Sequence, residues 1–388
     1  MLKEKLILGS LKIQNIILDI MSRFIYKQKP QVWEPKNICV YRIGNIGDLL
    51  CTIPALWQIR HHYPNAKITL LSSPGKKGAI SAQHVLQGFK CVDDIQLYYQ
   101  EDIRGLDKIK KFRVWLKSFE FDYFIQIPAV GTRFLQQVKA LVFFRLTGIK
   151  CADGFYLSTS NLFPEIQMKY LQPPTEVERC MIHLPFTADH CVKFGFCPSE
   201  RDLVIVERCL KEIRGSSSGP LAALSFFGKK ATQRWPLNYF ADIAQRWVME
   251  QKGITVLIGG VTESVMADEI IENIPGKFRA DVINLCGRFT IQQSMCFLQR
   301  CQLLVSIDTG TAHMAAIADV PCVGIYSAYN LPYQWYAYGK NIRILRKNLI
   351  CSPCMKNECK YGRFAKCMEA ISPEEVWQQI MELCVLWK

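Results

Sequence analysis

The segment Arg42-Ile-Gly-Asn-Ile-Gly-Asp48 joins a short apolar run, 38–43, to a helical pattern. Gly44 and Gly47 permit a tight turn and a close approach of the backbone to a ligand. Their Gly-x-x-Gly spacing differs from the Gly-x-Gly-x-x-Gly of dinucleotide sites, which argues against a dehydrogenase. We consider two compatible roles for Asp48. It caps the helix, and it presents to a ligand a carboxylate that the helix dipole keeps ionised.

A second strand-to-helix segment, Ser306-Ile-Asp-Thr-Gly-Thr-Ala-His313, carries a different set of groups. Thr309 and Gly310 would present backbone N–H groups at a helix N-terminus, which is a natural site for a diphosphate. Asp308 and His313 flank these amides. A lone histidine on a helix is usually structural, but one five residues after an aspartate at a strand end is a better candidate for function.

Four of the 17 cysteines lie close together in the sequence, in the pattern Cys351-x2-Cys354-x4-Cys359-x7-Cys367. This spacing is compatible with a structural zinc or iron–sulfur site, and the alternative is four reduced thiols in a packed loop. Most of the other cysteines stand singly in apolar segments, where a reduced cysteine behaves as a small hydrophobe. We find no secretory signal or membrane-spanning stretch in the sequence, and we expect a cytoplasmic protein.

Alternating strands and helices must position these groups, and such alternation predicts parallel sheets covered by helices, an α/β fold. The pattern restarts after Arg214-Gly-Ser-Ser-Ser-Gly-Pro220, so we expect two Rossmann-like, doubly wound domains that face a cleft. The predicted parts are an N-terminal helix and linker, 1–36, a first domain, 37–213, a linker, 214–220, and a second domain with a cysteine-containing tail and a C-terminal helix, 221–388.

The N-terminal segment 3–27 reads as an amphipathic helix. It is interpreted either as a helix packed on the first domain or as an anchor at an anionic membrane surface. The formal net charge of +14 suits an anionic partner, although a merely soluble basic surface explains it equally well. The chain has no nucleic-acid-binding motif. The charged positions are Lys5, Lys12, Asp19 and Arg23, and the apolar positions opposite them are Leu6, Ile13, Ile17, Ile20 and Phe24.

Taken together, the motifs resemble glycosyltransferase family 9, the ADP-heptose:lipopolysaccharide heptosyltransferases. The stretch 42–56 is similar to the family's N-terminal signature, and Asp308-Thr-Gly-Thr-Ala-His313 is similar to its Asp-Thr-Gly-x-x-His. Gln233-Arg-Trp-Pro236 resembles a Lys-x-Trp-Pro element, and the four spaced cysteines resemble a tail found in many members. The likeness runs from about residue 37 to residue 380.

The resemblance implies a GT-B fold with the acceptor on the first domain and a nucleotide sugar on the second. It implies an inverting transfer that needs no metal, with Asp48 as the general base. The donor would be ADP-heptose, and the acceptor a lipopolysaccharide core or another envelope glycan at the inner face of the cytoplasmic membrane. Residues matching the donor site are Glu263, at the ribose, and Asp308, Thr309, Gly310 and His313.

One position departs from the family pattern, because Gln233 stands where the family has a phosphate-binding lysine. We expect Arg234 to supply the missing charge, with Lys229 and Lys230 as alternatives. The departure also keeps two other functions open. One is transfer from a different nucleotide sugar, and the other is a non-catalytic module that binds nucleotide sugars or glycans.

Overall fold

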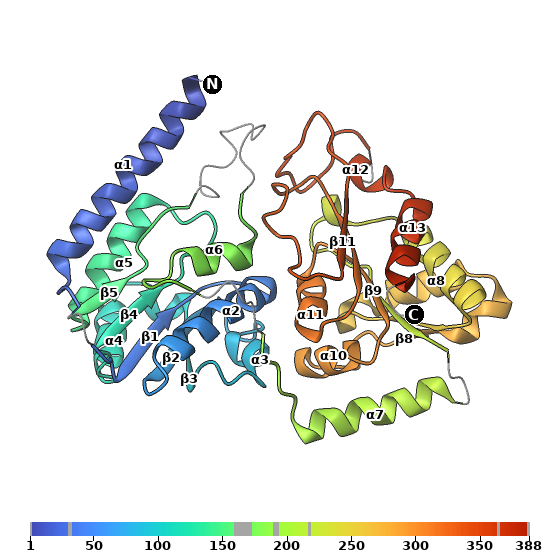
Figure 1. Cartoon of the computed structure of the whole chain (residues 1–388), viewed down its shortest axis with the longest axis horizontal. Helices are drawn as coiled ribbons and strands as arrows, with labels where there is room; N and C mark the ends of the chain where they lie inside the picture. Colours follow the sequence, from blue (N-terminus) through green and yellow to red (C-terminus); the bar gives the residue numbers. More distant parts are fainter. Residues whose placement is uncertain are drawn as a thin grey trace. The chain divides into compact units, whose positions relative to one another are not determined.

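The computed structural model describes residues 2–29, 33–158, 173–188, 194–215, 219–362 and 365–385. It divides into two compact units, Met1–Gly195 and Phe196–Lys388, and each is built on one parallel sheet with helices packed around it (Figure 1). The α/β fold with two doubly wound sheets is therefore confirmed. None of the helices in the described ranges is both long and apolar enough to cross a bilayer.

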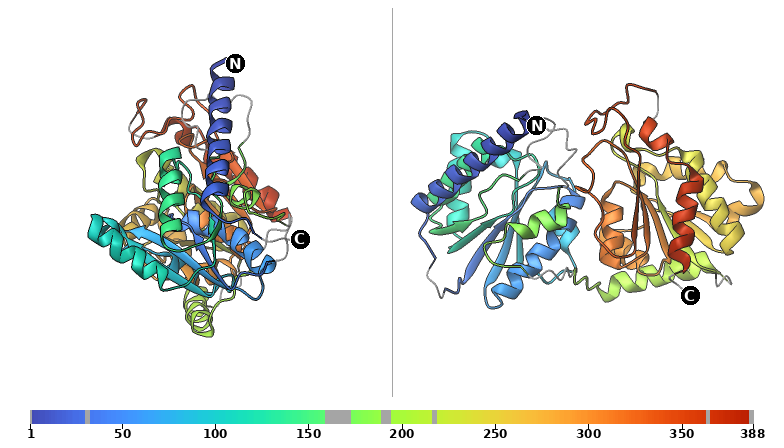
Figure 2. Two further views of the ribbon diagram at one scale, coloured as in Figure 1. Left: turned by 90° about the vertical axis from the view of Figure 1, so that its left-hand side faces the viewer. Right: turned by 45° about the horizontal axis from the view of Figure 1, so that its top comes forward.

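The first unit has a five-stranded sheet in the order β3-β2-β1-β4-β5. The central strand β1 is buried through Ile38, Cys39 and Val40, as expected of a parallel strand that is covered on both faces. Figure 2 shows helices on both sides of this sheet. The elements are α1 (Leu2–Ile25), β1 (Asn37–Tyr41), α2 (Ile46–His62), β2 (Lys67–Gly75), α3 (Ala82–Leu86), β3 (Asp94–Tyr99), η1 (Gln100–Ile103), α4 (Leu106–Lys117), β4 (Tyr123–Gln126), α5 (Phe134–Leu146), β5 (Cys151–Asp153) and α6 (Glu176–Ile182).

The second unit has a six-stranded sheet in the order β11-β10-β9-β6-β7-β8. Its core is continuous from the strands to the two C-terminal helices, through Met368 on one and Trp377 on the other. The elements are α7 (Glu200–Arg214), β6 (Leu221–Ser225), η3 (Ala231–Gln233), α8 (Leu237–Gln251), β7 (Ile254–Leu257), η4 (Val261–Glu263), α9 (Ser264–Glu272), η5 (Gly276–Asp281), β8 (Val282–Asn284), α10 (Ile291–Leu298), β9 (Leu303–Ile307), α11 (Gly310–Ala318), β10 (Cys322–Tyr326), β11 (Ile342–Arg346), α12 (Lys366–Glu369) and α13 (Pro373–Cys384).

The boundary between the units differs from the expected one. The sequence placed 37–213 in the first domain, whereas the division falls after Gly195, so that α7 belongs to the second unit. The reason is that α7 packs against α10 and forms ion pairs from Glu207 to Arg300 and from Glu212 to Arg288. Part of the expected linker 214–220, residues 216–218, lies outside the described residues.

In each sheet the chain order reverses beside a central strand. β1 lies between β2 and β4, and β6 lies between β7 and β9, so each sheet has a topological switch point at the carboxyl ends of its strands. Ligands of doubly wound sheets bind at such points. The motif at 42–48 follows β1, and the motif at 306–313 spans the end of β9.

The N-terminal helix α1 packs along α5 in the first unit (Figures 1 and 2). The contact is made by Leu11 and Leu18, which meet Phe134 and Val138. The apolar positions singled out in the sequence lie elsewhere on the helix and are exposed. The helix is thus packed on its unit, but through a different stripe from the one that the sequence indicated.

Candidate active site

Asp48 lies in the first turn of α2, just beyond the carboxyl end of β1. The N-cap of this helix is Asn45, and Asp48 is the third helical residue, so the N-cap role considered for Asp48 belongs to its neighbour. The backbone N–H of Asn45 donates to Oδ2 of Asp48 over 2.9 Å, as in a capping box. Its second oxygen, Oδ1, lies 3.5 Å from Nη2 of Arg42.

A buried network of charges stands behind Asp48. Arg42 is fully buried, and its Nη2 donates to Oε1 of Glu176 over 2.7 Å. Arg179 donates to both oxygens of Glu176, from Nε over 2.7 Å and from Nη2 over 2.6 Å. The carbonyl of Pro128, just after β4, accepts from both arginines. The network therefore joins the end of β1 to the end of β4, across the switch point of the first sheet.

The network and the burial act on Asp48 in opposite directions. Burial raises the pKa of Asp48, while the Arg42 guanidinium and the Asn45 N–H hold it down, and the net result is a pKa above the ordinary value. Burial alone would also raise the pKa of Glu176, but its hydrogen bonds and charges from Arg179 and Arg42 bring it below the ordinary value. Asp48 is therefore a stronger base than a free aspartate, and Glu176 stays ionised.

The turn that carries Asp48 has a steric requirement for glycine. A Cβ at Gly44 would lie 2.2 Å from Cβ of Asp48 and 2.7 Å from its Cγ, so a larger residue would displace the carboxylate. Gly47 is half-buried in the first turn of α2, directly before Asp48. The close packing of Gly44 thus fixes where the acidic side chain points.

In the second unit Asp308 follows β9 at the switch point beside β6. Its Oδ2 accepts from Nε2 of Gln233 over 3.1 Å and from Nδ2 of Asn330 over 3.0 Å. Burial raises the pKa of Asp308 to about 6, although both amides and the charges of Arg346 and Lys230 oppose the shift. Gln233 therefore replaces the positive charge expected at this position by a neutral amide, and this amide donates a hydrogen bond to an acidic side chain.

Arg234 and Lys230, two of the cations that the sequence offered for the diphosphate, make different contacts. Arg234 folds back, with Nε donating to the carbonyl of Gly228 over 2.9 Å and its guanidinium 4.7 Å from the ring centre of Phe227. Lys230, which the sequence gave as an alternative, is half-buried and stacks 3.5 Å above the ring centre of Tyr329. The charge of Lys230 is one of those that lower the pKa of Asp308.

Arg346 lowers the pKa of Asp308 more than Lys230 does, and sequence reasoning did not single it out. It lies at the end of β11 and donates to the carbonyls of Ser327 and Asn330, each over 2.8 Å. Arg346 thereby ties the end of β11 to the loop that supplies Asn330.

Helix α11 begins directly after Asp308. Thr309 is its N-cap and Gly310 its first residue, so the predicted backbone amides do lie at a helix N-terminus beside the switch point. The hydroxyl of Thr309 lies 3.4 Å from that of Ser306. His313 is buried in the first turn of the helix. The segment 308–313 can therefore present N–H groups and a partial positive charge to an anion.

Glu263 lies after β7, at the end of the short helix η4. Oε1 of this residue accepts from the Thr262 hydroxyl over 2.7 Å. A Cβ at Gly260 would lie 2.6 Å from Oε2, so the glycine makes room for the carboxylate over the turn. Glu263 is thus at the same edge of the sheet as Asp308, because the carboxyl ends of parallel strands share one edge.

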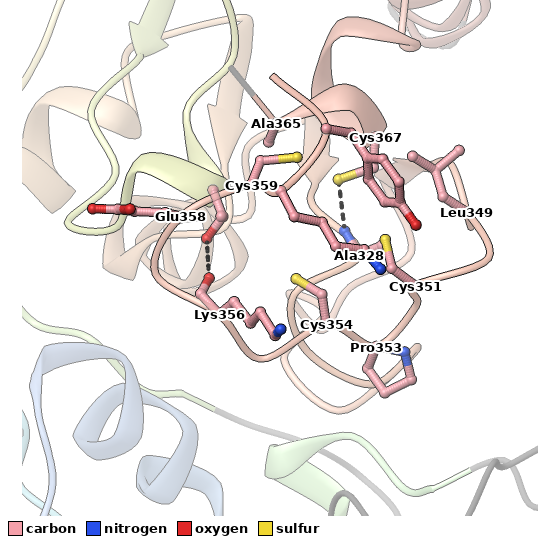
Figure 3. A pocket seen from close by; sticks show the side chains of 13 residues that line it. Ala328, Leu349, Cys351, Pro353, Cys354, Lys356, Glu358, Cys359, Ala365 and Cys367 are labelled. Carbon is pink, nitrogen blue, oxygen red and sulfur yellow. Dashed lines mark hydrogen bonds between the residues drawn. The ribbon is translucent and has the colours of Figure 1, made fainter. Parts of the chain in front are cut away.

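The four spaced cysteines line one pocket of about 240 Å³ in the second unit (Figure 3). Burial raises the pKa of Cys367, and the thiols of the other three cysteines raise it further. Sγ of Cys367 accepts a hydrogen bond from the N–H of Ala328 over 3.4 Å. Among the described residues, no three His, Cys, Asp or Glu side chains are gathered closely enough to hold a metal ion. The cysteines that share this pocket are Cys351, Cys354, Cys359 and Cys367.

Sequence reasoning missed several residues of these sites. The helix that carries Glu176 has a readable signal, since Thr175 and Glu178 form a Thr-x-x-Glu capping box. The strand that ends at Arg346 has alternating apolar residues, Ile342 and Ile344. The contacts of Glu176 and Arg346 with the residues near Asp48 and Asp308, in contrast, join distant parts of the chain, and no local sequence pattern predicts them.

The chain is similar to known proteins in sequence and in fold. The model of the family described as Glycosyltransferase family 9 (heptosyltransferase) matches residues 165–365, just over half of the chain. Lipooligosaccharide heptosyltransferase 2 of Campylobacter jejuni is 27% identical over 153 residues, which are 39% of this chain and 47% of the relative. The chain thus spans about half the length of this curated relative.

Two further proteins are similar over more of the chain. The lipopolysaccharide core heptosyltransferase OpsX of Haemophilus influenzae is 21% identical over 304 residues, 76% of this chain and 80% of the relative. The solved structure of ADP-heptose lps heptosyltransferase II from E. coli superimposes with a TM-score of 0.65 at 17% identity, covering 90% of this chain and 99% of that one. At that identity, the likeness to the solved structure shows a shared fold.

Proposed function

The chain belongs to glycosyltransferase family 9, and from this premise we propose that it transfers a heptose from ADP-heptose to a glycan acceptor of the bacterial envelope. The observation that carries the proposal is the environment of Asp48. A carboxylate that stands at a switch point, is made more basic by burial and is held by a buried arginine is suited to accept a proton. The donor and the acceptor class are taken from the names of the relatives.

In the proposed reaction the first unit binds the acceptor, and the second binds the nucleotide sugar. An acceptor hydroxyl attacks C1 of the heptose on the side opposite the diphosphate. Its proton passes to Asp48, and the C1–O bond to ADP breaks with inversion at C1. The transition state resembles an oxocarbenium ion, so a carboxylate is a sufficient base.

The leaving diphosphate gains negative charge as the bond to C1 breaks. The amides at the start of α11, near Thr309 and Gly310, supply a partial positive charge for it. We assign the full positive charge to Lys230 in preference to Arg234, because Arg234 folds back onto the carbonyl of Gly228 and the ring of Phe227. No metal is needed for this chemistry. We place the ribose at Glu263, in keeping with carboxylates that follow Rossmann-like strands.

The test is transfer by the Asp48→Asn variant. Asn can still accept the hydrogen bond from Asn45, so we expect an intact fold and unchanged ADP binding by calorimetry. Transfer should fall about 10²–10⁴-fold, the range for loss of a general base. A variant that transfers heptose at the wild-type rate would leave Asp48 with its capping-box role alone.

A non-catalytic binding module is the second candidate function, and Gln233 is the observation that favours it. This residue fills the family's lysine position with a neutral amide that bonds Asp308. Thermal shifts with ADP, UDP, GDP and NAD separate the candidates, since a ligand stabilises in proportion to ln(1 + [L]/Kd). A shift with UDP or GDP but not ADP would indicate a different donor, and a shift without any transfer would indicate a binding module.

We also propose that the protein acts at the inner face of the cytoplasmic membrane. Its relatives are named for lipopolysaccharide and lipooligosaccharide, whose lipid part anchors the acceptor in a membrane. The net charge of +14 favours approach to an anionic lipid surface.

For the C-terminal cysteines we propose a structural metal, zinc or iron, that takes no part in the transfer. The four thiols on one pocket support this, because soft metals prefer thiolate ligands. The thiols are not gathered at one point in this structure, so binding would have to draw them together and displace their protons.

A further inference from the structure

Helix α1 has two apolar faces, of which only one is covered. Leu11 and Leu18 pack on α5, whereas the opposite stripe is left open. A helix turns 100° per residue, so positions spaced by three and four residues share a face, and the open stripe lies about half a turn away from the packed one. Its members are Leu6 (66% exposed), Ile13 (59%), Ile16 (57%), Ile17 (40%), Ile20 (47%) and Phe24 (88%).

The helix is held firmly in the orientation that exposes this stripe. Asn15 and Leu157 exchange two hydrogen bonds, of 2.8 and 2.7 Å, and the Tyr26 hydroxyl donates to the carbonyl of Leu141 over 2.7 Å. Nε of Arg145 also donates to the carbonyl of Ile25. Rotating α1 to bury the open stripe would break these contacts, so the exposure is built into the packing.

The surroundings of the stripe are strongly basic. Residues 8–29 contain four Lys or Arg and one Asp, and 133–150, which include α5, contain four Lys or Arg and no acidic residue. The acidic side chain of Asp19 is already paired with Arg23 at 2.9 Å. α5 also exposes apolar side chains of its own, at Leu135 and Leu146.

We propose that the open stripe of α1 docks on an anionic lipid surface, with the helix lying in the plane of the interface. An apolar stripe inside a field of positive charge has the pattern of an interfacial helix, in which apolar side chains enter the acyl boundary and cations meet the headgroups. A second copy of the chain is a poorer occupant, since pairing two such faces would bring like charges together. Isolated exposed apolar residues are ordinary, but six on one face are not.

The proposal adds a docking face to the membrane location proposed above and does not depend on the transfer chemistry. Vesicle binding without any sugar donor therefore tests it separately from the function. The full-length protein is mixed with vesicles of phosphatidylcholine alone, and with vesicles that contain phosphatidylglycerol, and then floated on a density gradient. We expect binding to the anionic vesicles, weakened by salt because the cations are screened.

The informative variant carries Ile13→Asp and Ile17→Asp. Its control carries Val204→Asp and Val265→Asp, which make the same charge change at exposed apolar positions of α7 and α9. We expect the Ile13 and Ile17 variant to bind anionic vesicles at least about tenfold more weakly than the control, since it removes two inserted side chains. Equal binding of the two variants, or no binding by the wild type, would overturn the proposal.

Two measurements separate lipid insertion from misfolding and from self-association. In Phe24→Trp, bromine-labelled lipids should quench the added tryptophan beyond the quenching seen in the wild type, and lack of that extra quenching contradicts insertion even if the aspartate variant misfolds. Light scattering without lipid should show the same mass for the wild type and the Ile13 and Ile17 variant. A dimer that this variant dissociates would assign the stripe to self-association instead.

Discussion

Replacing Glu176 by Gln tests whether the buried network supports both the fold and the base. Glu176 is fully buried between two arginines and accepts three charge-assisted bonds of 2.6–2.7 Å. Removing its charge takes away the counter-charge that Arg42 and Arg179 share, and leaves Arg42 with the longer, 3.5 Å contact to Asp48. Breaking a buried ion pair on one side costs about 3–5 kcal/mol, and because Gln keeps one acceptor in place we expect about 3 kcal/mol.

The same change should alter the pH dependence of transfer in a definite direction. The negative charge of Glu176 raises the pKa of Asp48, so its removal lowers that pKa and strengthens the hold of Arg42 on Asp48. The base must be ionised, and activity falls as the pH drops through its pKa. The acidic limb of the rate profile should therefore move to lower pH in Glu176→Gln.

The assays are urea unfolding and a pH–rate profile of ADP-heptose transfer. Glu207→Gln is the matched control, because Glu207 pairs with Arg300 where both side chains are about half exposed, and such surface pairs contribute only about 0–1 kcal/mol. A loss in Glu176→Gln that is no larger than in this control would refute the stability argument. An acidic limb that stays in place or moves to higher pH would refute the electrostatic argument.

Three further predictions concern the second unit. Lys230→Ala should lower kcat/KM by an amount that corresponds to a loss of about 2–4 kcal/mol of transition-state stabilisation, and Arg234→Ala should lower it much less. A larger loss in Arg234→Ala than in Lys230→Ala would assign the phosphate contact to Arg234. Asp308 has a pKa of about 6, above its value of about 3.9 in an unfolded chain, so the folded protein binds its proton more readily. Its contribution to the free energy of unfolding is therefore greatest below the unfolded pKa and is lost as the pH rises through 6. Asp308→Asn should remove this part of the pH dependence, measured by urea unfolding at a series of pH values. The same pH dependence in the variant and the wild type would contradict the assignment. Anaerobically purified protein should contain near-stoichiometric zinc or iron by elemental analysis, and Cys351→Ser with Cys354→Ser should lose it together with stability; a well-folded wild type free of metal would exclude the proposed site.

The sheets were readable from the sequence because parallel strands covered on both faces are short apolar runs with sharp ends. β9 is such a run, and the helix after it, α11, begins at Gly310, where the sequence predicted a helix N-terminus. The groups that follow β1 and β9 could be placed for the same reason. Because the end of a strand determines where the next turn begins, the positions of Asp48 and Asp308 after β1 and β9 could be predicted from the sequence.

The charges around those groups were not readable, because each depends on a distant contact. Glu176 meets Arg42 across 134 residues of chain, and its carboxylate looks in sequence like one more exposed acid in a helix. The role of Gln233 was also not predictable from the sequence, because its partner Asp308 is distant along the chain. In the comparison with the family pattern, Gln233 occupies the position of a phosphate-binding lysine. In the fold, its side chain is one of two amides that donate hydrogen bonds to Asp308.

The two acidic residues at the switch points are stabilised by opposite means, and this difference bears on their tasks. Asp48 has a cation beside it, and that cation is already neutralised by Glu176, so Asp48 can remain ionised and still be basic. Asp308 is held by neutral amides, and Lys230 and Arg346 act on it from farther away. A lysine at position 233 would bind Asp308 as an ion pair and fix its charge. With glutamine there, Asp308 is bonded by neutral amides instead, and we propose that the charge of Lys230, which stacks on Tyr329, serves a diphosphate.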